Sequence, residues 1–355
     1  MTTNIIAFAV VLGVLIFFHE LGHFLAARFF KVGVEKFSLG FGPRLFGKKV
    51  GITDYRISAI PLGGYVKMVG EEPGADIDPE DIPISFTHKS VYKRIVIVSA
   101  GPVFNLILAV IVFFIISITN GMYYLTPTVG KMTENGPAMN AGMKEGDIIL
   151  SIDDGAGEKP VETWDDMAVI ISESNGAELK FLVHRDDGNH WIVVRPELKT
   201  TKNLFGEDQK RYLIGVTSSG KTEKKELSFN EAFIESFVQT YKISELMVVS
   251  VAKLITGAVS HKTLGGPIMI AQMAGEQAKE GFLNLLNFIA VISINLGILN
   301  FLPIPVLDGG HLLFFIIEAG LGRPINTRIR EIAQQTGMFF LLLLMILVTY
   351  NDITR

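Results

Sequence analysis

Residues 4–30 read NIIAFAVVLGVLIFFHELGHFLAARFF, an apolar stretch long enough to cross a bilayer as one helix. Three ionisable residues, His19, Glu20 and His23, interrupt it ahead of Arg28 near its end. A cleaved signal peptide is a poor interpretation, because the first residues MTTN contain no Lys or Arg and because ionisable side chains do not belong in its apolar region. The stretch therefore predicts a first transmembrane helix that carries polar side chains inside the membrane.

Three further apolar stretches predict three more spans, at residues 95–118, 283–302 and 337–350. The last is short, so we expect its helix to begin earlier or the bilayer to thin locally. The chain has 355 residues, of which only 19% are charged. Soluble domains carry about 25%, so the composition predicts a membrane protein with a soluble part.

Composition also excludes several kinds of function. The chain contains no cysteine, which rules out disulfides, thiolate zinc sites and cysteine nucleophiles. Its net charge of -4 gives no general positive field for nucleic acid. No nucleic-acid partner is therefore expected.

The distribution of Lys and Arg predicts the orientation of the spans. Basic residues gather after the first span and between the third and fourth spans. Both loops should be cytoplasmic, because loops rich in Lys and Arg stay inside. The two termini and residues 123–280 then lie outside.

The segment outside reads as a mixed α+β region followed by an amphipathic helix, and we expect that helix at 229–256, on the membrane surface. Its other elements are predicted from alternation, turn residues and helix caps. They are a strand at Ile148–Ile152, a helix capped by Thr163 and running to about Ser172, a hairpin of Glu178–His184 with His190–Arg195 around DDGN, and a last strand at Tyr212–Val216. On the cytoplasmic side, Tyr55–Ile60 predicts a strand, the following PLGGYVKM a glycine-centred turn, and Glu71–Pro83 a surface loop.

The residues His19-Glu20-Leu21-Gly22-His23 form the pattern HExxH. On a helix, positions i and i+4 lie about 40° apart around the axis, so both imidazoles can reach one metal ion. Glu20 is placed to take a proton from a water molecule that the metal activates. Each ionisable residue inside a span costs about 2.5–3.5 kcal/mol on insertion scales, so a functional cluster is favoured over the alternative, a polar cluster for helix packing.

Zinc needs a third protein ligand, and the sequence offers three candidates. Asp308 is favoured, because it follows Pro303 and Pro305 at the end of the third span in NFLPIPVLDGGH, where an unwound segment can line a wet cavity. Its alternative role is a helix cap. Glu35 is near the pattern in sequence, and His311 is more consistent with a packing or supporting role.

Other protease classes find no support in the sequence. Ala26 and Phe29 stand where the metzincin extension of HExxH needs Gly and His. There is no GxSxG motif. No second intramembrane Asp is present to pair with Asp308 as in an aspartyl protease.

Several motifs together resemble the bacterial site-2 protease family, in particular its RseP-type intramembrane zinc metalloproteases. The motifs run in order along nearly the whole chain: HELGH at 19–23, FGP at 41–43, PLGGYVKM at 61–68, GPVFN at 101–105, LGGP at 264–267 and NFLPIPVLDGGH at 300–311.

The resemblance assigns roles to particular residues. It implies Zn²⁺ held by His19, His23 and Asp308, with Glu20 as the catalytic glutamate. Asn300 would help to hold the substrate or the oxyanion. Tyr55–Met68 is similar to the family's membrane-reentrant β-hairpin, which adds an unwound substrate as a strand.

The resemblance also implies a domain organisation. Residues 1–122 hold spans one and two with HExxH and the reentrant β region. The stretch GPAMNAGMKEGDIILSID resembles a PDZ domain, expected at 123–220 outside the membrane. Residues 221–280 form an amphipathic helical linker, and 281–355 hold spans three and four with the LDG motif. Many relatives carry two PDZ domains, whereas this chain has room for one.

The function implied is proteolysis within the bacterial inner membrane. The substrate would be a single-span protein, such as an anti-sigma factor, first trimmed outside by a site-1 type protease; remnant signal peptides are another class. The alternative is a non-catalytic zinc-binding scaffold or transporter with a PDZ adaptor. Transport favours paired metal sites and inverted repeats, and the sequence shows neither.

Overall fold

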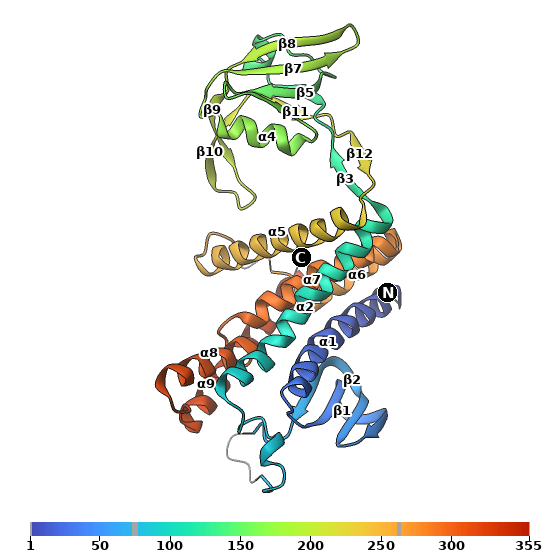
Figure 1. Ribbon diagram of the computed structural model, residues 1–355, viewed down its shortest axis with the longest axis vertical. Coiled ribbons are helices and arrows are strands. Elements are labelled where there is room, and N and C mark those ends of the chain that lie inside the picture. The colour runs from blue at the N-terminus through green and yellow to red at the C-terminus, as the bar shows by residue number, and fades with distance from the viewer. Residues whose placement is uncertain (1, 73–76, 261–263, 355) are drawn as a thin grey trace. The chain divides into compact units, whose positions relative to one another are not determined.

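The computed structural model describes residues 2–72, 77–260 and 264–354, which form two compact units (Figure 1). Unit 1 consists of Met1–Ser117 and Phe229–Arg355, and unit 2 of Ile118–Ser228. The chain thus leaves unit 1 near the end of one long helix and returns to it at the start of another.

Within the described residues, four helices of unit 1 are long and apolar enough to cross a membrane, as the prediction of four spans requires. They are α1 (Thr2–Phe29), α2 (Val91–Asn120, whose last residues belong to unit 2), α7 (Phe282–Phe301) and α9 (Thr327–Thr354). The last helix begins ten residues before the apolar stretch at 337–350, as its short length led us to expect.

Two further helices of unit 1, α5 (Phe229–Ile255) and α6 (Pro267–Glu280), complete the packing around these spans. The helix predicted at 229–256 is therefore confirmed. Burying apolar side chains between helices gains little in a membrane, because lipid is equally apolar. Membrane helices associate instead through close packing, which small residues allow. The core of α1, α2, α6 and α7 accordingly contains four alanines that are at most 5% exposed, namely Ala7, Ala109, Ala274 and Ala290.

A long hairpin of β1 (Val34–Val50) and β2 (Thr53–Met68) packs against α1 (Figure 1). One expectation for this region is confirmed and one is wrong. PLGGYVKM lies within β2, yet the chain reverses there as expected: Leu39 pairs with Ile57 on one side and with Gly64 on the other, and the two halves of β2 run in opposite directions. Tyr55–Met68 is not a hairpin whose arms pair with each other, because residues 36–39 of β1 lie between its two halves.

Unit 1 has a second core, which joins the hairpin to the helices. It unites Phe37 and Val66 of the strands with Ala27 of α1, Ile97 of α2 and Phe315 of a short helix, α8 (Asp308–Leu321). The 3-10 turn η1 (Ile82–Ile84) lies in the loop expected at Glu71–Pro83, of which residues 73–76 fall outside the described residues.

The break between α7 and α8 is tightly packed backbone. A Cβ built on Gly309 would lie 2.1 Å from the carbonyl oxygen of Leu302, and one on Gly310 would lie 2.3 Å from that of Ile304. Only glycine fits there, so the turn fixes where α8 begins. Leu307, not Asp308, takes the N-cap position, and no side chain caps the helix.

Unit 2 contains a four-stranded antiparallel sheet in the order β6-β5-β7-β8. The predicted β7–β8 hairpin, the strand at Ile148–Ile152 and the helix capped by Thr163 are all confirmed; Thr163 and Asp166 form a capping box. The elements of the unit are β3 (Met122–Leu125), β4 (Val129–Met132), α3 (Pro137–Asn140), β5 (Ile148–Asp153), β6 (Glu158–Pro160), α4 (Trp164–Glu173), β7 (Leu179–Arg185), β8 (Gly188–Val194), β9 (Glu197–Lys202), β10 (Asp208–Leu213), β11 (Val216–Ser218) and β12 (Thr222–Lys225).

The single last strand expected at Tyr212–Val216 is wrong. Gly215 has φ of 80°, which ends β10, and the chain continues as β11 and β12. Strand β11 pairs with β4 and β12 pairs with β3, so the last strands of the unit pair with its first two.

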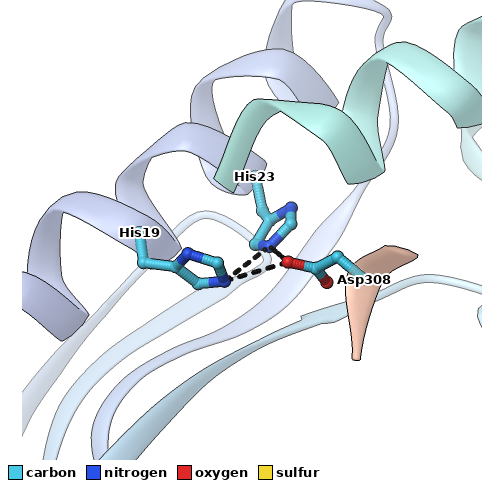
Figure 2. Close-up of side chains that lie close together, drawn as sticks. All are labelled: His19, His23 and Asp308. Atoms are coloured by element: carbon cyan, nitrogen blue, oxygen red, sulfur yellow. Dashed lines mark hydrogen bonds and ion pairs between the residues drawn. The ribbon is translucent and has the colours of Figure 1, made fainter. Parts of the chain in front are cut away.

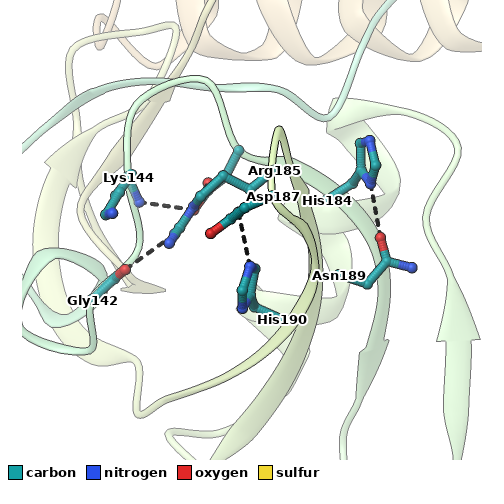
Figure 3. A network of polar contacts seen from close by, with 8 residues as sticks. Gly142, Lys144, His184, Arg185, Asp187, Asn189 and His190 are labelled. Carbon is teal, nitrogen blue, oxygen red and sulfur yellow. Dashed lines mark hydrogen bonds and ion pairs between the residues drawn. The ribbon is translucent and has the colours of Figure 1, made fainter.

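One ion pair ties the β7–β8 hairpin to the loop before β5 (Figure 3). The side chain of Asp147 is fully buried and accepts hydrogen bonds from Arg185 at 2.7 and 2.8 Å and from the backbone N–H of Lys144 at 2.8 Å. Burial alone would raise the pKa of Asp147, but these donors hold it below its ordinary value.

Candidate metal centre

His19 and His23 lie one turn apart on α1, in its C-terminal half. Their rings meet edge to face, and the two Nε2 atoms are 3.3 Å apart. His23 is 8% exposed. Helical spacing thus brings both imidazoles to one point, as HExxH predicts.

Asp308, the first residue of α8, completes the group (Figure 2). Its Oδ2 atom lies 3.1 Å from Nε2 of His19 and 3.5 Å from Nε2 of His23. That oxygen is buried and, across the described ranges, has no conventional hydrogen-bond partner. Figure 2 shows all three side chains converging from two helices on one point.

The three donor atoms have the spacing that a zinc ion requires. Zinc bound tetrahedrally at about 2.0–2.2 Å places neighbouring ligand atoms about 3.3–3.5 Å apart, and the observed separations are 3.1, 3.3 and 3.5 Å. Two imidazoles and a carboxylate are ligands that zinc prefers. The residues present therefore fit a zinc ion.

Small residues make room for the group on its helix side. A Cβ built on Gly101 of α2 would lie 2.3 Å from Nε2 of His23 and 2.9 Å from Cε1 of His19. A Cβ on Gly22 would lie 2.3 Å from the backbone oxygen of Ala100. These two glycines allow α1 and α2 to cross closely enough for the histidines to face the space between them.

Glu20 and the three donor side chains line one cavity of about 580 Å³. Glu20 is 9% exposed, and β2 passes beside it, since a Cβ on Gly64 would lie 3.0 Å from its Cγ. The strand segment Gly64–Met68 lines the cavity too. A peptide bond in this cavity would therefore meet an acidic side chain and a strand together.

The other predicted candidates lie elsewhere or play other parts. Glu35 lies 3.4 Å from Lys67 in an ion pair and is not in the donor group. His311 lines the cavity, yet it does not belong to the donor group found among the described residues. Asn300, near the end of α7, is not among the residues that line the cavity.

Three supporting contacts were not predicted from the sequence. Nδ1 of His23 lies 2.9 Å from the backbone oxygen of Ile97, and Nδ1 of His19 lies 3.1 Å from Nδ2 of Asn105. Arg94 of α2 holds α8 by donating two hydrogen bonds to the carboxylate of Glu318, at 2.5 and 3.2 Å. For two of these contacts the available signal was a polar residue within the apolar helix α2, namely Arg94 and the asparagine of GPVFN.

Comparison with known proteins agrees with this centre. The family model described as Peptidase family M50 matches residues 7–344. A Campylobacter jejuni protein named as a zinc metalloprotease is 39% identical, covering 99% of this chain and 93% of its own length. The Bacillus subtilis protein named regulator of sigma-W protease RasP is 33% identical and the Geobacillus kaustophilus protein named zinc metalloprotease RasP is 32% identical; each match covers 99% of this chain and 98% of the relative.

Proposed function

This chain belongs to peptidase family M50 and is a zinc metalloprotease with helices suited to a membrane, and from that premise we propose that it cuts other membrane proteins within their spanning segments. The observation that carries the proposal is the position of the donor group. Two of its residues lie inside a helix apolar enough to cross a membrane, and the third starts the helix that follows another such span.

In this proposal His19, His23 and Asp308 hold the zinc ion. A zinc ion held there would polarise the scissile carbonyl and make a water molecule more acidic. The three side chains fix its position from two helices, and the packing of Gly309 and Gly310 against the end of α7 keeps Asp308 in place.

Glu20 acts as the general base and then as the general acid. It takes a proton from the attacking water and passes it to the amine that leaves. Its place beside both histidines and in the same cavity supports this role. Asn300 is proposed to hold the substrate or the oxyanion, a role that rests on the family resemblance.

A spanning substrate must unwind before it is cut, because helical peptide bonds are hydrogen-bonded and shielded. We assign the β1–β2 hairpin to this step, as a membrane-reentrant edge that pairs with the substrate as an added strand. Two features support it: Gly64–Met68 lines the cavity, and the hairpin exposes apolar side chains, among them Leu45 and Phe46 at 57% and 72%.

Unit 2 is proposed to be the single PDZ domain, outside the membrane. Its four-stranded sheet, α4 and an apolar cavity of about 390 Å³ beside α4 support this identification. Apolar residues of α4 and of the segment before β11 line that cavity, including Met167, Ile171 and Ile214. The domain would control which substrates enter, by size or by holding a trimmed end.

The proposed setting is the bacterial inner membrane, with the metal centre toward the cytoplasmic side. One relative is named for regulating a sigma factor. Anti-sigma factors already trimmed by a site-1 type protease, and remnant signal peptides, are the substrate classes we propose.

The experiment that tests the proposal is a cleavage assay in detergent on a panel of single-span peptides, with and without a chelator. Glu20→Gln should bind zinc normally and cut at least about a hundredfold more slowly, the scale of a general base. Glu72→Gln is the matched control, because Glu72 lines the same cavity and its side chain is 76% exposed. Turnover by Glu20→Gln close to that of the control would remove Glu20 from the mechanism.

A further inference from the structure

Asn105 is a fully buried polar residue in the middle of α2. Its Nδ2 atom lies 3.1 Å from Nδ1 of His19. Its backbone oxygen accepts a hydrogen bond of 2.7 Å from the hydroxyl of Ser293 on α7. Its side-chain Oδ1 is buried and has no hydrogen-bond partner within the part of the chain that the structure describes.

The second histidine shows what a metal ligand needs at this centre. Nδ1 of His23 lies 2.9 Å from the backbone oxygen of Ile97. A carbonyl oxygen only accepts, so Nδ1 carries the hydrogen and the lone pair of Nε2 faces Asp308. Ligand histidines generally donate their other N–H to an oxygen in this way, which fixes the tautomer and the ring orientation.

His19 cannot donate its Nδ1–H to an oxygen as long as the amide nitrogen of Asn105 faces its Nδ1. An N–H₂ group donates, so Nδ1 must then accept, and the hydrogen of the neutral ring sits on Nε2. Yet Nε2 of His19 is the atom that lies 3.1 Å from Oδ2 of Asp308 and 3.3 Å from Nε2 of His23. A hydrogen there would occupy the direction in which the ring should bind the metal.

A half-turn of the Asn105 amide removes the conflict. The turn exchanges two groups of nearly equal shape and brings Oδ1 against Nδ1 of His19. The oxygen that now has no hydrogen-bond partner in the described residues thereby gains one. The lone pair of His19 Nε2 then faces the same point as that of His23.

We infer that Asn105 is a positioning residue of the metal centre, whose Oδ1 accepts the Nδ1–H of His19 and so directs Nε2 to the zinc ion. This inference rests on the proposed zinc ligands. Both histidines would then donate their Nδ1–H to an oxygen of α2: His23 to the backbone carbonyl of Ile97, and His19 to the amide oxygen of Asn105.

The test uses variants of the purified full chain in detergent, with zinc affinity measured by competition against a coloured chelator. Asn105→Leu has a similar shape and no acceptor, and it should bind zinc about 10- to 100-fold more weakly, the usual cost of losing such a support. Asn105→Asp keeps an acceptor and loses the amide donor. It should bind zinc within about threefold of the original chain, or more tightly, because a carboxylate raises the basicity of the ring.

Ser293→Ala is the matched control for packing. It removes the hydrogen bond to the backbone oxygen of Asn105 and leaves the Asn105 side chain unchanged. It should lower the thermal stability of the zinc-free protein and leave zinc affinity within about threefold. His19→Ala tests the ligand assignment itself: original affinity in that variant would refute the zinc site, not the support.

The zinc affinities of the two Asn105 variants distinguish an acceptor role of Asn105 from a donor role and from no role in zinc binding. Weak zinc binding by Asn105→Leu, with affinity kept in Asn105→Asp, supports the inference. Original affinity in Asn105→Leu overturns it, and so does a tenfold or larger loss in Asn105→Asp, which would show that the donor was needed. If Asn105→Leu does not fold, the Asp variant alone decides by the same criterion.

Discussion

Gly101→Ala is expected to weaken the metal centre without unfolding the protein. The new Cβ would lie 2.3 Å from Nε2 and 2.6 Å from Cε1 of His23, and 2.9 Å from Cε1 of His19. Carbon atoms in contact are normally about 3.5–4.0 Å apart. The imidazole of His23 must therefore move by roughly 1 Å.

That movement of His23 exceeds what zinc coordination tolerates, whereas the rest of the fold can accommodate it. Metal–ligand distances tolerate deviations of only about 0.2 Å. We therefore expect zinc affinity to fall by at least about a hundredfold, or roughly 3 kcal/mol. The stability of the zinc-free protein should change less, because overpacking costs about 1–3 kcal/mol and replacing Gly by Ala in a helix returns up to about 1 kcal/mol.

The assay is chelator competition for zinc affinity, together with thermal unfolding of the zinc-free protein. Gly13→Ala is the control, since Gly13 lies on α1 and a Cβ there meets nothing within 4 Å. It should keep zinc affinity and stability. Zinc binding by Gly101→Ala within about threefold of the control would refute the reasoning, because His23 Nε2 could then not be a ligand.

Three other predictions test the third ligand, the ion pair of unit 2 and the role of that unit. Asp308→Ala should lower the zinc content of purified protein more than Glu35→Ala or His311→Ala does; full zinc in the first with loss in the second would reverse the assignment. The pKa of Asp147 is lowered in the folded state, so its contribution to stability is present above about pH 4 and is lost as pH falls through its lower folded pKa. Asp147→Asn should therefore flatten the acid side of the stability profile, followed by the fluorescence of the chain's two tryptophans, both in unit 2; an unchanged slope would exclude this pair as its cause. Deleting about residues 126–217 should leave zinc binding intact and allow cleavage of substrates that keep a bulky outside domain; equal rejection of such substrates, normalised to enzyme amount, would argue against access control.

The local sequence predicted most of the elements and placed two of the three donor residues of the metal centre on one helix. Apolar runs of sufficient length predicted four spans, and the spacing of His19 and His23 placed two imidazoles on one helix face, since both depend only on neighbouring residues. The helix cap at Thr163 and the β7–β8 hairpin were also predicted correctly, because both depend on residues close together in sequence. For Asp308, the broken helix around it made it the favoured third ligand, but no local pattern showed that it lies beside His19 and His23.

Only the tertiary structure decided which distant groups meet. It brings Oδ2 of Asp308 within 3.1 Å of His19, and it places Asn105 against that same ring, through helix packing that no local pattern encodes. It also decided what the segments on either side of the turn in PLGGYVKM pair with, since residues 54–57 and 64–67 both pair with residues 36–39 of β1. The periodicity of apolar residues predicts a helix or a strand from neighbouring residues alone. The site across α1, α2 and α8 depends on contacts between distant segments, and the distance between them in the sequence does not predict which of them pack together.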